Sequence, residues 1–179
     1  MRWPRALGNS PLAALVLAVA ALPGAAAETA FVTNQSSSDL SVIDLATLKE
    51  VARLPVPGNP AGLAVADRLG AVYVVSPETK TVSRFSLGDK RPTGTLQLDG
   101  GPIGIAADEA RGRIFVSDWF NARAWVIDAA TLSVTGTLVT GSAPAGLAVS
   151  PDGRFLVTAD RDSDRLSVFD AETLAPLRR

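Results

Sequence analysis

The stretch PIGIAADEARGRIFVSDWFNARAWVIDAATLSVTGTLV, residues 102–139, contains four short runs rich in Val, Ile, Leu and aromatic residues. Clusters of Gly, Asp, Asn and Ser separate these runs, which is typical of strands and turns. None of the runs shows the 3.6-residue period of an amphipathic helix. We therefore expect strands near residues 103–107, 113–117, 123–128 and 133–139.

This four-strand pattern recurs along the chain with a period of about 42 residues, a length typical of structural repeats. The markers that keep the register are Pro60, Pro102 and Pro144; Gly62, Gly104 and Gly146; and the segments SVID, SRFS, WVID and SVFD, which begin at Ser41, Ser83, Trp125 and Ser167. A further marker, FVTN at 31–34, recurs as YVVS at 73–76, FVSD at 115–118 and LVTA at 156–159, the last step being one position shorter than the others. Quartets of antiparallel strands at a fixed period of this length predict the blades of a β-propeller.

The first strand of each repeat places Gly and Ala beside Leu or Val, as in GLAV at residues 62–65. Small side chains are expected there, because inner strands converge at the axis, where backbones approach closely. The later strands are nearly continuous apolar runs, which is typical of sheets covered on both faces. Trp125, inside such a run, is expected in the core.

Turn residues support the same register. Ser150-Pro151-Asp152-Gly153 is expected to join the first and second strands of its repeat, since a type I turn accepts Pro and Gly at these positions. Asp44, Asp128 and Asp170 are each followed at the third position by a Thr, so their carboxylates are expected to accept backbone N–H bonds in the next hairpin.

Residues 1–27 have the three-part layout of a secretory signal peptide. Arg2 and Arg5 precede an uncharged apolar run at residues 12–22, and small residues follow at 25–27. The run is well short of the roughly 20 residues that cross a bilayer. We expect cleavage after Ala27 rather than an uncleaved anchor, and a periplasmic or secreted mature chain without a membrane span. Loss of Arg2 and Arg5 takes the net charge from −1 to −3.

The segments FVTN, GNPAGLAV, SPDGR and LSVID, in this order and spacing, resemble the YVTN-type β-propeller repeat of YncE-like and surface-layer-type propellers. The resemblance covers about residues 29–177. It implies an exported propeller, commonly seven-bladed, whose repeat is itself not catalytic. Some similar propellers act as accessory proteins of a periplasmic oxidoreductase. The motifs mark blade packing and turns rather than a reacting group.

Residues 28–179 hold about 3.6 of these repeat units, whereas a seven-bladed ring needs nearly twice as many. Inner strands are expected near Ala61, Ile103 and Ala145, which leaves the first blade without one. A closed four-bladed ring is the alternative. We expect an all-β segment of about four four-stranded blades in an open, incomplete ring, with an uncovered strand edge and apolar faces. The chain is then either a truncated gene product or part of an assembly completed by a protein partner or a second copy.

Composition restricts the chemistry. The 179 residues include neither Cys nor His, which excludes disulfides, thiolate zinc sites, histidine-ligated metals or haem, and Ser-His-Asp relays. The small net charge disfavours nucleic-acid and anionic-membrane binding. We expect no catalytic residue and no cofactor, and a role in binding or scaffolding.

Candidate binding residues lie in loops expected on one face of the propeller, where functional groups usually gather. Trp119 and Phe120 are two large aromatics in the least repeat-like loop and are expected either to anchor a partner or to pack between blades. The other candidates of this face are Asn121, Arg123, Asn34, Gln35 and Asn59.

Two further features define the competing hypotheses. Asp160, Asp162 and Asp164 alternate like the opening of a calcium loop, but Arg165 and Ala171 occupy the positions where that loop needs Gly and Glu. They are weak metal candidates, in line with a lactonase-like or metal-dependent propeller enzyme. A basic cluster of Lys80, Arg84, Lys90 and Arg91, together with the two aromatics, would instead serve single-stranded nucleic acid.

Overall fold

The computed structural model describes residues 28–178, which form fifteen strands in four antiparallel sheets and three single-turn 3-10 helices. The expected signal peptide lies outside the described residues. Blade 1 contains β1 (Thr29–Asn34), β2 (Asp39–Asp44) and β3 (Lys49–Pro55). Blade 2 contains β4 (Leu63–Ala66), η1 (Asp67–Leu69), β5 (Ala71–Ser76), β6 (Thr81–Ser86) and β7 (Pro92–Gln97).

Blade 3 contains β8 (Pro102–Asp108), η2 (Glu109–Arg111), β9 (Arg113–Asp118), β10 (Arg123–Asp128) and β11 (Ser133–Val139), and blade 4 contains β12 (Pro144–Val149), β13 (Phe155–Asp160), η3 (Arg161–Ser163), β14 (Arg165–Asp170) and β15 (Pro176–Arg178).

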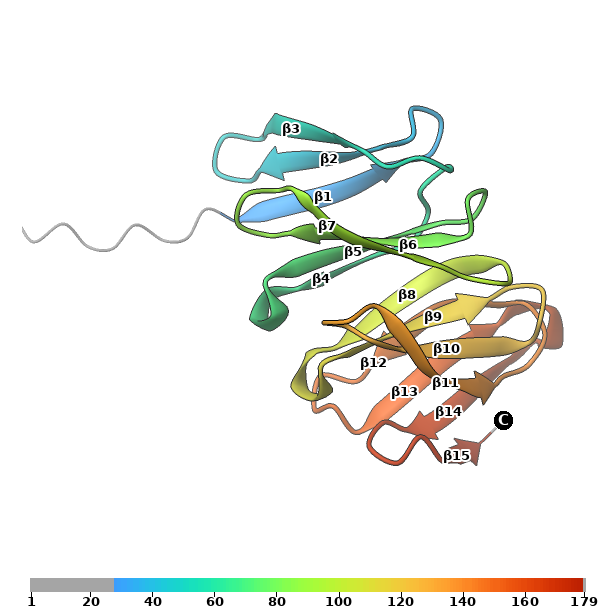
Figure 1. Cartoon of the computed structure of the whole chain (residues 1–179). Helices are drawn as coiled ribbons and strands as arrows, with labels where there is room; N and C mark the ends of the chain where they lie inside the picture. Colours follow the sequence, from blue (N-terminus) through green and yellow to red (C-terminus); the bar gives the residue numbers. More distant parts are fainter. Residues whose placement is uncertain (1–27, 179) are drawn as a thin grey trace, which may run out of the picture.

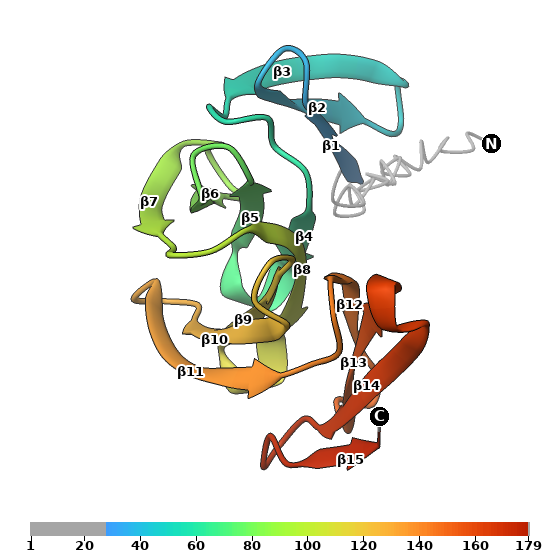
Figure 2. The same ribbon diagram turned by 90° about the vertical axis from the view of Figure 1, so that its right-hand side faces the viewer.

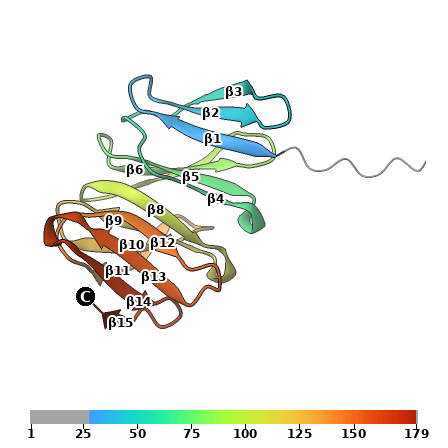
Figure 3. The ribbon, with the colours of Figure 1, turned by 180° about the vertical axis from the view of Figure 1, so that it is seen from behind.

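The four sheets are stacked in chain order, each a simple up-and-down meander (Figure 1). Seen along the axis, β4, β8 and β12 lie on the inner side of an arc, and β3, β7, β11 and β15 lie on its rim (Figure 2). Blades 1 and 4 stand at opposite ends of the stack, as the view from behind also shows (Figure 3). The expected fold class, an all-β propeller segment with an open ring, is confirmed.

The strands of the third repeat agree with the predicted ones to within one residue at each end. Within residues 28–178, blade 1 has three strands, and β1 pairs with β2 alone, so the expected absence of an inner strand is confirmed for this part of the chain. In blade 2 the regular strand β4 begins at Leu63, two residues after the expected start near Ala61, although the Ala61 N–H already donates to the Val75 carbonyl oxygen at 2.8 Å.

Apolar side chains between neighbouring blades form three clusters that make up the core. Tyr73 and Val75 of blade 2 pack with Trp125 and Ile127 of blade 3. Equivalent clusters join blade 3 to blade 4 and blade 1 to blade 2. Trp125 is 2% exposed, which confirms its expected place in the core. Each blade is therefore stabilised mainly by its neighbours, as in other repeat architectures.

At the axis, each blade bonds directly to the inner strand of the next. The Thr33 hydroxyl donates to the Ala61 carbonyl oxygen at 2.8 Å, and the Ser117 hydroxyl donates to the Ala145 carbonyl oxygen at the same distance. Between blades 2 and 3, the Gly62 N–H donates to the Ile103 carbonyl oxygen at 3.1 Å. The predicted close approach of the inner strands is confirmed, and it explains the small residues there.

The hairpins repeat as closely as the strands. The carboxylates of Asp44, Asp128 and Asp170 accept the backbone N–H groups of the Thr residues three positions later, at 2.7–2.8 Å, as predicted. The expected turn at residues 150–153 is also present, since the Gly153 N–H donates to the Ser150 carbonyl oxygen at 2.8 Å. These local bonds satisfy backbone groups that no ladder reaches.

Two sequence-based expectations were wrong. The fourth copy of the FVTN marker is VTAD at residues 157–160, because Asp160 pairs with Arg165 as Asp118 pairs with Arg123. The last step of this marker is therefore as long as the others. The outermost strands are not covered on both faces, and Val51 and Val139 are 61% and 62% exposed. Blades diverge towards the rim, so their neighbours no longer reach these side chains.

Gly104→Ala should destabilise the protein, because an added Cβ would overlap the Ala145 carbonyl oxygen of the next blade. We expect a loss of at least about 1–3 kcal/mol in the free energy of unfolding, the usual range for overpacking. Gly146, the equivalent residue of blade 4, has nothing within 4 Å of such a Cβ. Gly146→Ala is the matched control and should be neutral or slightly stabilising. Urea unfolding would measure both, and equal effects would contradict the axial-contact explanation.

Candidate functional site

The loop face is the side of the arc onto which Figure 2 looks, formed by residues 35–38, 56–62, 77–80, 98–101, 119–122, 140–143 and 161–164. Loops between second and third strands meet the connections between blades on this side. The Trp119 N–H donates to the Gly101 carbonyl oxygen at 2.9 Å, and the Arg161 N–H donates to the Ala143 carbonyl oxygen at 3.1 Å. The structure thus brings together the two kinds of loop as the sequence predicted.

Phe120 and Trp119 form the most distinctive feature of the loop face. Phe120 is 80% exposed, with its ring against Gly101, so it does not pack between blades. Trp119 is half-buried, and the Arg161 guanidinium of blade 4 lies 5.2 Å from its ring centroid. This cation–π contact ties the loop of blade 3 to that of blade 4. We call Trp119, Phe120 and Arg161 the aromatic platform.

Asp118 holds the loop that presents this platform. Its fully buried carboxylate accepts hydrogen bonds from the Gly101 N–H at 2.9 Å, the Phe120 N–H at 3.3 Å, the Asn121 amide at 2.8 Å and Arg123 Nε at 2.7 Å. A buried carboxylate with this many donors is well compensated for its loss of water. The backbone at residues 119–121 is therefore fixed before any partner arrives.

Burial by itself raises the pKa of Asp118, but the hydrogen bonds from the Gly101 N–H, Arg123 and Asn121 outweigh it. The pKa accordingly lies below the ordinary value of 3.8, and the group is ionised at neutral pH. The same carboxylate raises the pKa of Arg123. A carboxylate so firmly ionised is a poor general acid or base near pH 7.

Asn121 and Arg123, both expected as binding residues, are engaged by the protein itself. Arg123 bonds Asp118 through Nε and Asp99 through Nη2 at 2.6 Å, and its guanidinium lies 4.9 Å from the Trp125 ring centroid. Asn121 donates to Asp118 and closes the same loop. Their place in the structure is that of positioning residues beneath the aromatic platform.

Asn34, Gln35 and Asn59 lie on the loop face but at blades 1 and 2. The Asn34 amide donates to Asp39 and to the Ser41 hydroxyl, both at 2.7 Å, and Glu50 and Arg53 extend this polar network across blade 1. The Asn59 amide donates to Glu78 at 2.6 Å. Gln35 is exposed. These three residues do not join the aromatic platform of blades 3 and 4.

Of the three aspartates of the weak metal candidate, one is buried and bonded within the protein, and the other two are exposed. Asp160 is 1% exposed, and its carboxylate accepts hydrogen bonds from Thr158, Ser167 and the Gly141 N–H at 2.6–2.9 Å. Asp162 and Asp164 are exposed beside it. Within residues 28–178, no three carboxylates are grouped so that they could hold a metal ion.

Arg161 is a member of the platform that the sequence analysis missed. It lies one full repeat after Trp119 and occupies the equivalent position in the next blade, where Gln35 and Pro77 stand in blades 1 and 2. The repeat period could have paired the two residues, because equivalent loops of neighbouring blades lie side by side on one face.

The predicted basic cluster is divided between two ends of blade 2. Lys80 precedes β6 on the loop face, whereas Lys90 and Arg91 follow that strand at its other end, roughly 20 Å away for six residues. Arg84 reaches into blade 3, where it donates to the carbonyl oxygens of Ala129, at 3.0 Å, and Ala130. No continuous basic surface joins these residues to the aromatic platform.

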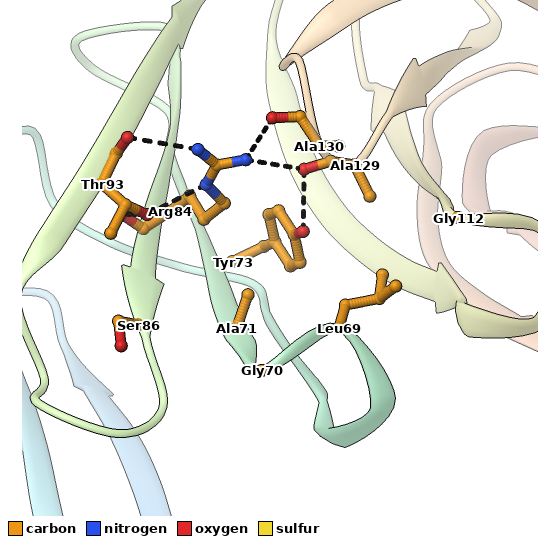
Figure 4. A pocket seen from close by; sticks show the side chains of 10 residues that line it. All are labelled: Leu69, Gly70, Ala71, Tyr73, Arg84, Ser86, Thr93, Gly112, Ala129 and Ala130. Carbon is orange, nitrogen blue, oxygen red and sulfur yellow. Dashed lines mark hydrogen bonds between the residues drawn. The ribbon is translucent and has the colours of Figure 1, made fainter.

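A pocket of about 330 Å³ lies between blades 2 and 3, on the side opposite the loop face (Figure 4). Arg84 is the charged residue of its lining, and its donors are already taken by Thr93 and the blade 3 carbonyl oxygens. The Tyr73 hydroxyl donates to the Ala129 carbonyl oxygen at 2.9 Å. Burial raises the pKa of Tyr73, which keeps the phenol neutral. The pocket is a gap between blades with no reactive group directed into it.

The described part of the chain has no helix long and apolar enough to cross a bilayer. No protein-family model matches the chain, and no curated protein matches it. Among solved structures, a chain of hydrazine synthase from Kuenenia stuttgartiensis is similar over 84% of this chain, with a TM-score of 0.75 and 24% sequence identity. This chain spans 45% of the length of that one. The likeness supports the fold and carries no function with it.

Fold and loop face together define a β-propeller segment of one three-stranded and three four-stranded blades, with an aromatic platform at blades 3 and 4. Different residues form the aromatic platform and hold its loop in place. Phe120 is exposed to solvent, whereas Asp118, Asn121 and Arg123 fix the loop that carries it.

Asp118→Asn should lower the stability and weaken its dependence on acid. The folded-state pKa is depressed, so the stabilisation is present above the unfolded value of about 3.9 and is lost as pH falls through the folded pKa. We expect a loss of about 2–3 kcal/mol at pH 7, since a buried ion pair loses one charge.

The measurement is urea unfolding between pH 7 and pH 2.5, with Asp162→Asn as the control. Asp162 is exposed and lies 3.9 Å from Arg161, so its loss should change stability by less than about 1 kcal/mol. A variant at position 118 as stable as the wild type at pH 7 would contradict the proposed role of Asp118.

Proposed function

We propose that this protein binds a partner protein through the aromatic platform and acts as a scaffold without catalysing a reaction itself. The observation that carries the proposal is the 80% exposure of Phe120 on a loop whose backbone is already fixed by Asp118. Large aromatic and arginine side chains supply most hot spots of protein interfaces. A fixed loop loses little conformational entropy on binding, which favours affinity.

The geometry supports binding better than catalysis. The two buried carboxylates near the platform, Asp118 and Asp160, each accept at least three hydrogen bonds from the protein. A general base or a metal ligand needs a free lone pair directed at a substrate or an ion. The lactonase-like and metal-dependent alternatives therefore find no support in the arrangement of residues 28–178.

We further infer membership of the YVTN-type, YncE-like group of propellers, because the repeat markers recur in order and at constant spacing in sequence and structure. The proposal includes export by the signal peptide at residues 1–27 and a periplasmic or secreted location. A partner within an oxidoreductase system follows from the family resemblance. A protein partner that completes the ring is compatible with the open arc.

Phe120→Ala should reduce capture of the partner at least tenfold when the tagged full-length protein is recovered from its native host, because a hot-spot side chain contributes about 2 kcal/mol or more. Its unfolding free energy should change by less than about 0.5 kcal/mol, since the side chain is exposed. Leu48→Ala is the matched control: Leu48 is 78% exposed but lies on the opposite side of blade 1. Equal capture by the Phe120 variant and the wild type would contradict the proposal.

Fluorescence of Trp119 separates protein binding from the two competing functions. Under the proposal, neither a single-stranded oligonucleotide nor calcium changes the emission of the folded protein, and the partner does. A saturable response to the oligonucleotide, absent in Trp119→Phe, would establish nucleic-acid stacking instead. A response to calcium that depends on Asp162 and Asp164 would establish the metal-dependent alternative.

A further inference from the structure

β1 occupies the position in blade 1 that β5, β9 and β13 occupy in the complete blades. Those three strands each pair with an inner strand: β4, β8 and β12. In blade 2, Val75 faces the inner strand, because its carbonyl oxygen accepts the Ala61 N–H and its own N–H donates to Gly62, both at 2.8 Å. Thr33 is the equivalent of Val75 one repeat earlier. The backbone of Thr33 therefore faces an edge that no strand occupies within residues 28–178.

The neighbouring blade shows that no strand within residues 28–178 fills this position. Ile105 and Ala107 of β8 pack in the cluster between blades 2 and 3, and Ile105 is 8% exposed. Their equivalents in β4, Leu63 and Val65, face blade 1. Val65 is 39% exposed and lines a cavity of about 650 Å³ with Phe31, Leu87 and Lys90. Val65 is thus less covered than its equivalent Ala107, and the cavity beside it is larger than the gap of about 330 Å³ at the equivalent place between blades 2 and 3, where an inner strand is present.

The hydrogen bonding of the Thr33 hydroxyl gives a second indication that blade 1 has no inner strand within residues 28–178. In blade 3, the Ser117 hydroxyl donates to Ala145 and also accepts the Gly104 N–H of its own inner strand at 2.9 Å. In blade 1, the Thr33 hydroxyl makes the equivalent donation to Ala61 at 2.8 Å. A strand docked along β1 would bring its glycine N–H to the acceptor side of Thr33, as Gly104 does at Ser117.

We propose that the inner edge of β1 is a docking site for an extended segment of another polypeptide with the pattern Pro-x-Gly-Leu/Ile-Ala. The pattern is that of the inner strands of this chain, PAGLA at residues 60–64, PIGIA at 102–106 and PAGLA at 144–148. Such strand addition gains affinity from main-chain hydrogen bonds and specificity from alternate side chains. This site is separate from the aromatic platform, and the inference does not depend on the proposed function.

The glycine of the pattern is the specificity element. A Cβ on Gly104 would overlap the Ala145 carbonyl oxygen, and one on Gly62 would lie 2.6 Å from the Ile103 carbonyl oxygen. In the docked segment, the equivalent glycine would face the Ala61 carbonyl oxygen of blade 2. A β-branched residue there cannot approach without displacing Ala61, so the site rejects generic β-strands.

A second copy of this chain is a poor occupant of the site. Its three inner strands are already paired within their own blades, and lending one would open a blade and its core cluster. The alanine of a docked segment, the equivalent of Ala64, would instead face blade 2 and cover Val65, with no blade to be opened. A separate polypeptide can therefore pair with the inner edge of β1 without the free energy that a second copy would lose by opening one of its blades.

The test uses the full chain and a synthetic peptide with the sequence of residues 59–67, NPAGLAVAD, with blocked ends. We expect saturable binding in calorimetry and slowed hydrogen exchange at the amides of Phe31 and Thr33. The matched control peptide carries Val in place of the glycine and should bind at least tenfold more weakly. This comparison leaves the protein unchanged, so misfolding of a variant cannot affect it.

Two protein variants locate the site. Thr33→Val should weaken peptide binding about fivefold through loss of the hydroxyl acceptor, whereas Ser117→Ala, which alters the equivalent hydroxyl in an occupied blade, should leave it unchanged. Phe120→Ala should also leave it unchanged, which separates this result from the platform. Equal affinity for the two peptides would overturn the inference, and so would protection from exchange at blade 4 instead of β1. It would also be overturned if no binding were seen at about 1 mM peptide, the weakest affinity of practical use. Protection of Thr33 that depends only on protein concentration would indicate self-association and would overturn it as well.

Discussion

The inner strands must approach one another within hydrogen-bond distance at the axis, and the rest of the molecule follows from this. The Gly62 N–H reaches the Ile103 carbonyl oxygen, and Thr33 and Ser117 reach the inner strands of the following blades. Only small residues leave room for these bonds. Once the inner strands are fixed, the second and third strands of neighbouring blades face each other and bury Trp125 and its neighbours. The outer strands, farther from the axis, diverge and stay exposed.

The same repeat places variable residues on fixed supports. At the position of Asp118, blades 1 and 2 have Asn34 and Ser76, and blade 4 has Asp160. Asp118 and Asp160 bind backbone N–H groups of the loop face, whereas the shorter Ser76 is fully buried and its hydroxyl finds no partner among residues 28–178. The loop after Asp118 is thus the best anchored of the four and carries the most unusual side chains, Trp119 and Phe120. The loop at residues 119–122 is therefore both firmly anchored and different in sequence from the equivalent loops of the other blades.

Much of the fold could be predicted because a constant repeat period with four apolar runs in each unit has one common solution. The strands of blade 3, the Asp128 turn and the burial of Trp125 all followed from it. The marker of the fourth blade was displaced by one residue, because LVTA begins with a large apolar residue as FVTN does, whereas the true equivalent VTAD begins with Val157, and only strand pairing reveals the register. The roles of Asn121 and Arg123 could not be predicted, since their partner Asp118 meets them across a hairpin and their side chains look free in the sequence.

The two ends of the arc differ in polarity. Leu40 of β2 packs against blade 2, so its neighbours Asp39 and Ser41 point the other way and, with Glu50 and Arg53, give the terminal face an ionic surface. At the far end, Leu166 and Val168 cover the outward side of blade 4, and Leu166 is 55% exposed. Head-to-tail stacking of identical molecules would bury this ion-paired group against aliphatic side chains, and the loss of water around the charges would oppose the contact. This difference in polarity between the two end faces therefore opposes the growth of filaments. Each end face stays free to bind a different protein.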